Sequence, residues 1–591
     1  MDSWSESPLP DGEILVRNRR NGKQMVLPVE IVNAMSFCTR FRTLDEHLDE
    51  LVDGSEGEDS AEVAARRAGI RSVIQSLQEG GMTISAQEIC DRLTAPPAVN
   101  PVTQKPILTV ITWQRPEALA RLLDSLLLRC DPEGIERCFV IDDSRDPESI
   151  RKNRDITLTA AQQAEIKLDY FGEAEARRLL DELVDALPQH EEAIRFLIDR
   201  DRWASHWTCG ISRNYSQLLS VGHPLIVFDD DVICDVHEAP FARPGIDLAN
   251  YPRQAEFFAS QQEWPPTAAA GQRDPVARHM RCLGLTVPEA LSILGVNRPE
   301  AAALHQGEAE LADRLHASSR VLVTECGSLG DPGTGNNQWL TRLSAESRKR
   351  LLKDEKTFLT ALKKRNSWLG RPRFTFSPAS NMSQISGTDN RDFLPPYFPF
   401  NRVEDRLFGQ TTSFIFPKSV SLDQPWGTPH LPMPERSWTQ RSNDFTLTDR
   451  FPCDLLFLPQ GLHQACPFDE PMDRLRYLAH HYLDLANCPD NELIQLFADD
   501  WHDKRSARLL NLHDNLRQSV DEPLIWREYL HKAMQQVVNS SLGKLTEENL
   551  EGSTPALAGN ELLNFWKDSF RSYGQSLLAW PEIREAVRRK L

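Results

Sequence analysis

The first 95 residues combine one alternating apolar pattern with three helical ones. Apolar positions at 13–17 and 24–27 flank Asn21-Gly22, a pair that suits the tight turn of a β-hairpin. Apolar residues then recur every three or four positions, as in amphipathic helices, at 29–38, 44–51 and 70–77. Thr43 can cap the second helix, and the acidic stretch 53–60 is predicted to be a loop. Together these elements predict a winged-helix-like α+β module over residues 1–95.

A Pro-rich linker at 96–105 leads into a long segment, 106–450, with the pattern of an α/β domain. Short β-branched apolar runs predict strands at 107–112, 138–141, 166–171, 195–198, 225–228 and 321–324. Amphipathic stretches predict helices that begin near residues 116, 173 and 212. Strands that alternate with helices form a parallel sheet, and right-handed crossovers place their carboxyl ends at one edge.

Two further stretches are dominated by helical patterns. Residues 240–320 are Ala-rich and are predicted to form a helical insertion within the α/β domain. Residues 451–591 are predicted to form a C-terminal helical domain.

The composition excludes several classes of protein. Hydrophobic residues make up 40% and charged residues 26%, which is ordinary for globular proteins and argues against global disorder. Lys and Arg number 67 against 86 Asp and Glu, a formal charge of −19, so nucleic acid is not an expected partner. No apolar run approaches the ~20 residues that cross a bilayer, so no transmembrane segment is predicted.

The cysteines point to a reducing compartment. They number 11, stand singly along the chain and form no C-x-x-C pair. This spacing favours free, mostly buried thiols over a disulfide framework or a zinc site. Because no signal-peptide pattern is found at the N-terminus, a cytoplasmic location is expected.

The strongest chemical signal is Asp229-Asp230-Asp231, directly after the predicted strand 225–228. Side chains alternate along a strand, so Asp229 and Asp231 can point the same way and hold Mn²⁺ or Mg²⁺. A metal there can bridge a diphosphate and offset the charge that develops as it leaves. A solvated cluster of loop acids is the structural alternative.

Two turn-rich segments are predicted to be loops over the ligand edge. They contain Asp331, in 327–337, and Asp389 with Asn390, in 387–391, which are candidates for binding an acceptor. An ordinary hairpin or crossover uses the same residue types.

The order of these motifs resembles the GT-A glycosyltransferases, and among them the family 2-like inverting enzymes, over residues 105–435. The motifs are Thr109-Val-Ile-Thr-Trp-Gln-Arg-Pro116, the acidic pair Asp142-Asp143, Gly210-Ile-Ser-Arg-Asn214, Phe228-Asp-Asp-Asp231 in the place of the D-x-D motif, and Glu404-Asp405 in the place of the acceptor-side acidic motif. His430 stands where the family has a late metal-binding histidine.

The resemblance implies a Rossmann-like nucleotide-diphospho-sugar transferase core and a set of site residues. The residues implied to hold the nucleotide sugar are Thr112, Arg115, Asp142, Asp143, Arg213, Asn214, Asp229 and Asp230. The implied metal ligands are Asp229, Asp231 and His430, and Trp426 is implied to lie on the acceptor side. A lone histidine in a Pro-rich loop is also often a surface residue.

Asp405 is the candidate catalytic base. An inverting transfer is a single displacement, in which one carboxylate takes the proton of the acceptor nucleophile. Glu404 would then face the acceptor or a neighbouring helix. Alternatively, the Glu-Asp pair only begins a helix, whose N-terminus favours acidic side chains.

The N-terminal module resembles the small PqqD-like peptide-binding winged-helix domains in the order of its hairpin and helices. This implies a peptide or protein acceptor, with a growing glycan or a small metabolite as alternatives. A DNA-reading winged helix is the rival interpretation. The acids of the central helix, Asp45, Glu46, Asp49 and Glu50, argue against it because they would repel phosphate.

The sequence therefore predicts a metal-dependent inverting glycosyltransferase with a nucleotide-sugar donor, for which a UDP-sugar is the leading candidate. One alternative is a non-catalytic scaffold with a degenerate GT-A domain and a peptide-binding module. The other is a nucleotidyltransferase on the same nucleotide-binding architecture. The presence of the acidic triplet, the Glu-Asp pair and His430 argues against the scaffold. The donor sugar and the oligomeric state do not follow from the sequence.

Overall fold

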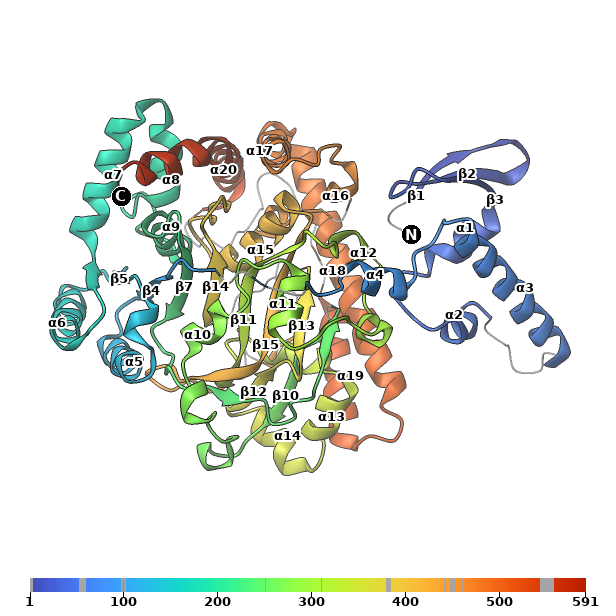
Figure 1. Ribbon diagram of the computed structural model, residues 1–591, viewed down its shortest axis with the longest axis horizontal. Coiled ribbons are helices and arrows are strands. Elements are labelled where there is room, and N and C mark those ends of the chain that lie inside the picture. Colours follow the sequence, from blue (N-terminus) through green and yellow to red (C-terminus); the bar gives the residue numbers. More distant parts are fainter. Residues whose placement is uncertain are drawn as a thin grey trace.

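Figure 1 shows the computed structural model, in which a small N-terminal module lies beside a larger body built on a central sheet. The structure describes residues 4–52, 60–96, 99, 102–249, 251–309, 311–378, 384–439, 443–446, 453–459, 461–540, 542 and 557–590. The predicted loop at 53–60 lies almost entirely outside these residues, as does part of the predicted linker at 96–105. No described helix is both long enough and apolar enough to cross a membrane.

The predicted hairpin and helices of the N-terminal module are confirmed. The strands β1 (Trp4–Pro8), β2 (Glu13–Asn18) and β3 (Gln24–Pro28) form an antiparallel sheet. The helices are α1 (Val29–Ser36), α2 (Leu44–Leu51), α3 (Ser60–Glu79) and α4 (Ala86–Arg92). Thr43 caps α2 together with Glu46. The fourth helix was not predicted, although Ser85 and Glu88 form the same capping box at its start.

A large, mostly parallel sheet forms the centre of the body. The order of its main path is β6 (Leu168–Phe171), β5 (Arg137–Asp142), β4 (Ile107–Thr112), β7 (Pro224–Asp229), β14 (Ile385–Asp389), β11 (Arg320–Gly330), β15 (Ser419–His430), β13 (Phe374–Ser377) and β9 (Ile246–Leu248). β14 runs antiparallel to β7 and β11, whereas β11 and β15 are parallel. The strands β4, β5, β7, β11 and β15 therefore all end at one edge, called here the carboxyl edge. β14 ends at the opposite, amino edge.

Helices cover this sheet, and one predicted strand is a helix. The helices are α5 (Pro116–Arg129), α6 (Pro147–Gln163), α7 (Glu173–Ala186), α8 (Glu191–Ile198), α9 (Cys209–Leu219) and α15 (Glu404–Ile415). The prediction of a strand at 195–198 is wrong, because these residues end α8. Arg195 bonds back to Glu191, one helical turn earlier. A short apolar run alone does not distinguish a strand from the end of a buried helix.

The segment 240–320 is only partly helical, so the prediction of a helical insertion needs correction. It contains α10 (Pro275–Met280), α11 (Val287–Ile293) and α12 (Leu311–Arg314), but also β9 and β10 (Gln254–Phe257). β9 extends the sheet beside β13, and β10 pairs with β12 (Ser367–Gly370), while the short β8 (His237–Glu238) pairs with β15. Strands this short carry too few positions to show an alternating pattern.

Both predicted turn-rich loops contain strand residues. Gly327 to Gly330 belong to β11, and Gly387 to Asp389 belong to β14. At Gly327 a Cβ atom would lie 2.9 Å from the carbonyl oxygen of Leu369. The glycine is therefore required by the close approach of neighbouring strands and not by a turn. The helices α13 (Ala345–Leu351) and α14 (Glu355–Ala361) follow β11.

The C-terminal region is helical, as predicted, and packs onto the sheet domain. Its helices are α16 (Leu462–Ala465), α17 (Pro471–Asn487), α18 (Asp490–Gln518), α19 (Leu524–Asn539) and α20 (Gly559–Arg588). Figure 1 shows α20 beside α8 and α9. Trp566, Tyr573 and Trp580 of α20 are fully buried in one hydrophobic core with residues of β5, α8 and α9. The tail is thus part of the core of the body.

Candidate active site

The acidic triplet stands at the carboxyl edge, where β7 ends. Asp230 accepts hydrogen bonds from the Thr112 hydroxyl at 2.9 Å and from Arg115 at 3.1 Å. The same Arg115 nitrogen lies 3.1 Å from Asp231. Asp230 and Asp231 are buried, so the end of β4 and the first residues after it hold two of the three acids in place. Thr112 and Arg115 are thereby brought to the triplet, as expected.

Arg213 joins the third acid of the triplet to the Glu-Asp pair. Its Nη2 lies 3.2 Å from Asp229 Oδ1, and its Nε lies 3.6 Å from Asp405 Oδ1. The Arg213 side chain is 6% exposed, whereas the side chains of Asp229 and Asp405 are 41% and 33% exposed. Two accessible carboxylates from β7 and α15 therefore flank one buried guanidinium of α9.

The charge of this group is not fully satisfied by hydrogen bonds. Asp405 Oδ1 and Arg213 Nη1 are both buried atoms without a hydrogen-bond partner within the described residues. Burial acts to lower the pKa of Arg213, but the charges of Asp405 and Asp229 outweigh it, so the pKa is raised. Arg213 stays a cation, and one of its N–H groups is free for another ligand.

Glu404 differs from Asp405 in its surroundings. Its side chain is buried in the first turn of α15, with the residue 8% exposed. Burial and the neighbouring charge of Asp405 raise the pKa of Glu404 from 4.5 to about 7. Both acids also lie at a helix N-terminus, so the helix-start interpretation of the pair describes its location correctly.

His430 ends β15 and lies against the triplet. Its Nδ1 is 2.8 Å from the backbone oxygen of Asp331, which can only accept, so Nδ1 carries a proton. Its Nε2 faces Asp231 Oδ1 at 3.1 Å. Burial acts to lower the pKa of His430, but the hydrogen bond and charge of Asp231 outweigh it and raise the pKa. Those same contacts outweigh burial at Asp231 and lower the pKa of that carboxyl.

The Asp231–His430 pair is suited to a divalent cation. A histidine that donates its other N–H to a backbone carbonyl has the orientation usual for a metal ligand, and carboxylate oxygen suits Mg²⁺ or Mn²⁺. Within the described part of the chain, no three His, Cys, Asp or Glu side chains gather as a metal shell. Asp229, the third expected ligand, contacts Arg213. A cation at this pair would take its other ligands from phosphate and water.

The acids expected to hold the nucleotide base and ribose have partners within the protein. Asp142 accepts hydrogen bonds from Asn153 Nδ2 at 3.1 Å and from the Tyr170 hydroxyl at 2.8 Å. Asp143 pairs with Arg200 at 2.7 Å and accepts a hydrogen bond from the Thr208 hydroxyl. Asp142 ends β5 at the carboxyl edge, Asp143 follows it directly, and both are buried.

Asn214 lies on α9 but does not face the triplet. Its Nδ2 donates to the backbone oxygens of Leu197 and Tyr397, and its Oδ1 accepts from the Tyr397 amide. The residue is fully buried. Because its amide is used to tie α9 to the segment before α15, the structure gives it a packing role and leaves it no atom for a nucleotide.

The expected acceptor residues do not join the triplet. Asp389 pairs with Pro224, the first residue of β7, so it stands at the amino edge, and Asn390 follows it there. Trp426 is fully buried within β15, with its Nε1 bonded to Gln424. Asp331 lies beside His430, but its carboxylate is held by Arg365 at 2.5 and 2.7 Å. Asp389, Asn390 and Trp426 therefore lie away from the triplet, whereas the backbone oxygen of Asp331 orients His430.

Two exposed aromatic residues near the acidic triplet were not predicted. Trp113 and Trp207 are 42% and 57% exposed, and their ring centroids are 5.9 Å apart. Trp113 directly follows Thr112, and its amide points to Asp230. Their positions, Trp113 within the motif 109–116 and Trp207 shortly before the motif 210–214, are the sequence signal that could have identified them.

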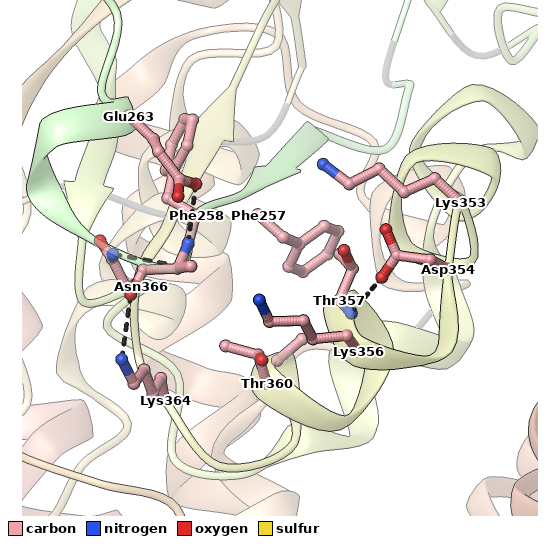
Figure 2. Close-up of a pocket in the computed structure, with 12 residues that line it drawn as sticks. Phe257, Phe258, Glu263, Lys353, Asp354, Lys356, Thr357, Thr360, Lys364 and Asn366 are labelled. Carbon is pink, nitrogen blue, oxygen red and sulfur yellow. Dashed lines mark hydrogen bonds between the residues drawn. The ribbon is translucent and has the colours of Figure 1, made fainter.

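A separate hollow of about 170 Å³ lies between β10 and α14 and contains none of these residues. Figure 2 shows Phe257 at its base, with Lys353, Lys356 and Lys364 around it. Asp354 accepts from the Thr357 amide at the start of α14, and Lys364 donates to the Ala259 oxygen. Both acids that line this hollow bind backbone amides, because Glu263 accepts from the Ala259 amide as Asp354 does from that of Thr357. The hollow is therefore not part of the acidic cluster.

Neither the family models nor the curated proteins compared with this chain contain a match.

Proposed function

We propose that the protein is an inverting glycosyltransferase of the GT-A type, which transfers a sugar from a nucleotide-sugar donor to an acceptor. The observation that carries this proposal is the bridge made by Arg213 between Asp229 and Asp405 at the carboxyl edge. It puts an accessible carboxylate opposite the acidic triplet, which is the arrangement that a single displacement needs.

In this proposal Asp405 takes the proton of the acceptor nucleophile. Its side chain is 33% exposed, and the guanidinium of Arg213 lies beside it. Glu404 is buried, with its pKa raised to about 7, and is therefore less suited to face an acceptor at neutral pH. Its role is to set the position and charge of the first turn of α15.

The donor diphosphate would lie near Arg115, the free N–H of Arg213 and the Asp231–His430 pair. Asp231 and His430 would hold Mn²⁺ or Mg²⁺. Such an ion supplies Lewis-acid stabilisation of the leaving diphosphate. Trp113 and Trp207 offer exposed aromatic faces beside this position, where a ring of either substrate can stack.

The acceptor is proposed to be a peptide or protein, on the basis of the resemblance of the N-terminal module. The three-stranded sheet and the helices α1 to α4 support this part of the proposal. Glycan and small-metabolite acceptors remain the alternatives to be tested with it.

The test incubates the protein with a panel of nucleotide sugars and candidate acceptors in the presence of Mn²⁺ or Mg²⁺. Mass spectrometry then detects the nucleotide released by hydrolysis or transfer, and any sugar added to an acceptor. Slow hydrolysis of at least one donor, lost in Asp405→Asn with donor binding retained, is expected. Metal-dependent nucleotide binding without any turnover would favour the scaffold. Release of a sugar 1-phosphate in place of a nucleoside diphosphate would favour the nucleotidyltransferase.

A further inference from the structure

A cavity of about 550 Å³ lies where the N-terminal module meets residues 301–309 of the body. Figure 1 shows this module at the side of the molecule, with α4 nearest the body. The apolar floor of the cavity is formed by Trp4, Met35, Ile74 and Met82. Its volume is within the range of about 300–1,000 Å³ that ligand pockets occupy. Met35 and Met82 are unbranched and can adapt to the shape of a ligand.

The rim of this cavity is cationic, although the protein is acidic overall. Arg20, Arg40 and Arg42 line it, and none of the described lining residues is an Asp or Glu. Arg20 is paired with Asp313, and Arg42 with Glu50. Arg40 is exposed and has no acidic partner within the described residues. One arginine charge at the rim is therefore available to an anion.

A histidine beside this rim also has an unused polar atom. His47 lines the cavity, and its Nδ1 is buried without a hydrogen-bond partner within the described residues. Burial, and then the charge of Arg42, lower the pKa of His47, so the ring is neutral at pH 7. A neutral imidazole can donate one N–H to a carboxylate oxygen.

Several backbone groups of the lining loops are already bonded, which disfavours a peptide as the occupant. Phe41 exchanges hydrogen bonds with Gly307 and Gln306 across the junction. The amides of Thr43 and Ser85 are taken by helix-capping glutamates, and the Met82 oxygen accepts from Trp4 Nε1. A bound peptide would bring backbone donors and acceptors that find few partners here. A hydrocarbon chain with one anionic head brings no such groups.

We propose that this cavity binds a single-chain amphipathic carboxylate, with its hydrocarbon chain on the Trp4, Met35, Ile74 and Met82 floor and its carboxylate at Arg40 and His47. The site is separate from the acidic cluster, and the proposal does not depend on the transferase activity.

The experiment is calorimetric titration of the full chain with decanoate below its micelle concentration, with decanol as the uncharged comparison. One decanoate is expected per chain, with decanol at least about tenfold weaker because it lacks the charge-assisted contact. Absence of saturable decanoate binding, or equal affinity for decanol, would overturn the proposal.

Two variants and a matched control locate the site. Ile74→Trp fills the floor and is expected to abolish binding, whereas Arg40→Glu reverses the rim charge and is expected to weaken it at least about tenfold. Arg17→Glu makes the same charge change at an exposed position of β2 that does not line the cavity, and should leave binding unchanged. Arg40 is exposed, so its variant should fold even if Ile74→Trp does not.

Binding that survives both Arg40→Glu and Ile74→Trp would place decanoate elsewhere and overturn the assignment. An acidic apolar peptide that displaces decanoate at a lower concentration would overturn it in favour of a peptide site.

Discussion

The two edges of the central sheet both carry acids beside arginines, but they differ in what the arginines leave accessible. At the carboxyl edge, Arg213 touches Asp229 and Asp405, and both carboxylates remain about one third or more exposed. At the amino edge, Asp389 is 1% exposed in its side chain and is held by Arg320 at 2.5 Å and by Arg391 at 2.6 and 2.9 Å.

The covering of the two edges explains the difference. At the amino edge, Arg584 of α20 donates to the side chain of Asn390 at 2.6 Å and to the backbone oxygen of Asp392. Burial lowers the pKa of Arg584 to about 9. Among the described residues, Asp229 and Asp405 instead share the ion-pair partner Arg213 of α9. Asp389 at the amino edge is thus held in ion pairs that stabilise the packing. At the carboxyl edge, Asp405 and Arg213 each have a polar atom without a hydrogen-bond partner within the described residues.

The largest expected effect is on turnover at the carboxyl edge. Asp405→Asn removes the proposed base and should lower the rate of transfer by about 10²–10⁴-fold, the range for loss of a general base. Nucleotide binding, measured by calorimetry with Mn²⁺, should be retained. Unchanged turnover would show that another group accepts the proton.

The matching change at the amino edge should affect stability and not the chemical step. Asp389→Ala removes the buried carboxylate that Arg320 and Arg391 share, although Arg320 keeps Asp392, and should lower the free energy of unfolding by about 3 kcal/mol. Denaturant unfolding measures this loss. Turnover per folded molecule should stay at the wild-type level, and a specific loss of turnover would return Asp389 to the list of site residues.

Glu404 provides a pH test of the carboxyl edge. Its folded pKa of about 7 is above its ordinary value of 4.5, so the folded state holds a proton that the unfolded state releases. The stability that this bound proton gives the folded state is fully present below pH 4.5 and is lost as the pH rises to about 7. The loss amounts to at most about 3 kcal/mol of unfolding free energy. In Glu404→Gln this fall in unfolding free energy should be absent. Parallel pH profiles of the two proteins would contradict the raised pKa.

The smallest of these effects concerns His430. His430→Gln removes the nitrogen that faces Asp231 and should raise the concentration of Mn²⁺ needed for half-maximal activity by about tenfold, or about 1.4 kcal/mol. His279→Gln is a comparison, because His279 is buried beside Thr324 and Trp426 and has no contact with the triplet. An identical metal requirement in wild type and His430→Gln would remove His430 from the proposed metal ligands.

Much of the local structure followed from the sequence alone. The capping residue Thr43, the hairpin over 13–28, and the apolar runs of β4, β5 and β7 are local signals, and the structure confirms each of these elements. The connection of the hairpin is longer than a two-residue turn, and only Gly22 of the Asn21-Gly22 pair has a positive φ. The strand wrongly predicted at 195–198, which is the end of α8, and the strands missed within 240–320 are short segments. Segments of this length show no distinctive hydrophobic period.

The placement of the acids could be predicted only in part. A parallel strand has its carboxyl end at a predictable edge, so Thr112, Asp142, Asp143 and Asp229 were expected together and stand at one edge. The direction of β14 was not predictable, because nothing local to residues 385–389 states which neighbours it pairs with. That antiparallel pairing sends Asp389 and Asn390 to the far edge.

The sequence by itself determined which residues are charged, which of the longer segments are helical or extended, and which acids follow buried strands. Only the tertiary structure decided which carboxylates have their charge compensated by neighbours. The carboxylate of Asp142 accepts a hydrogen bond from Tyr170, and the amide of Asn214 likewise bonds to the backbone of Tyr397. Asp229 and Asp405, in contrast, share one arginine, and their side chains stay partly exposed. The reason is physical: solvation and pairing of a charge depend on all groups within a few ångströms, and the fold brings these together from positions far apart in the chain.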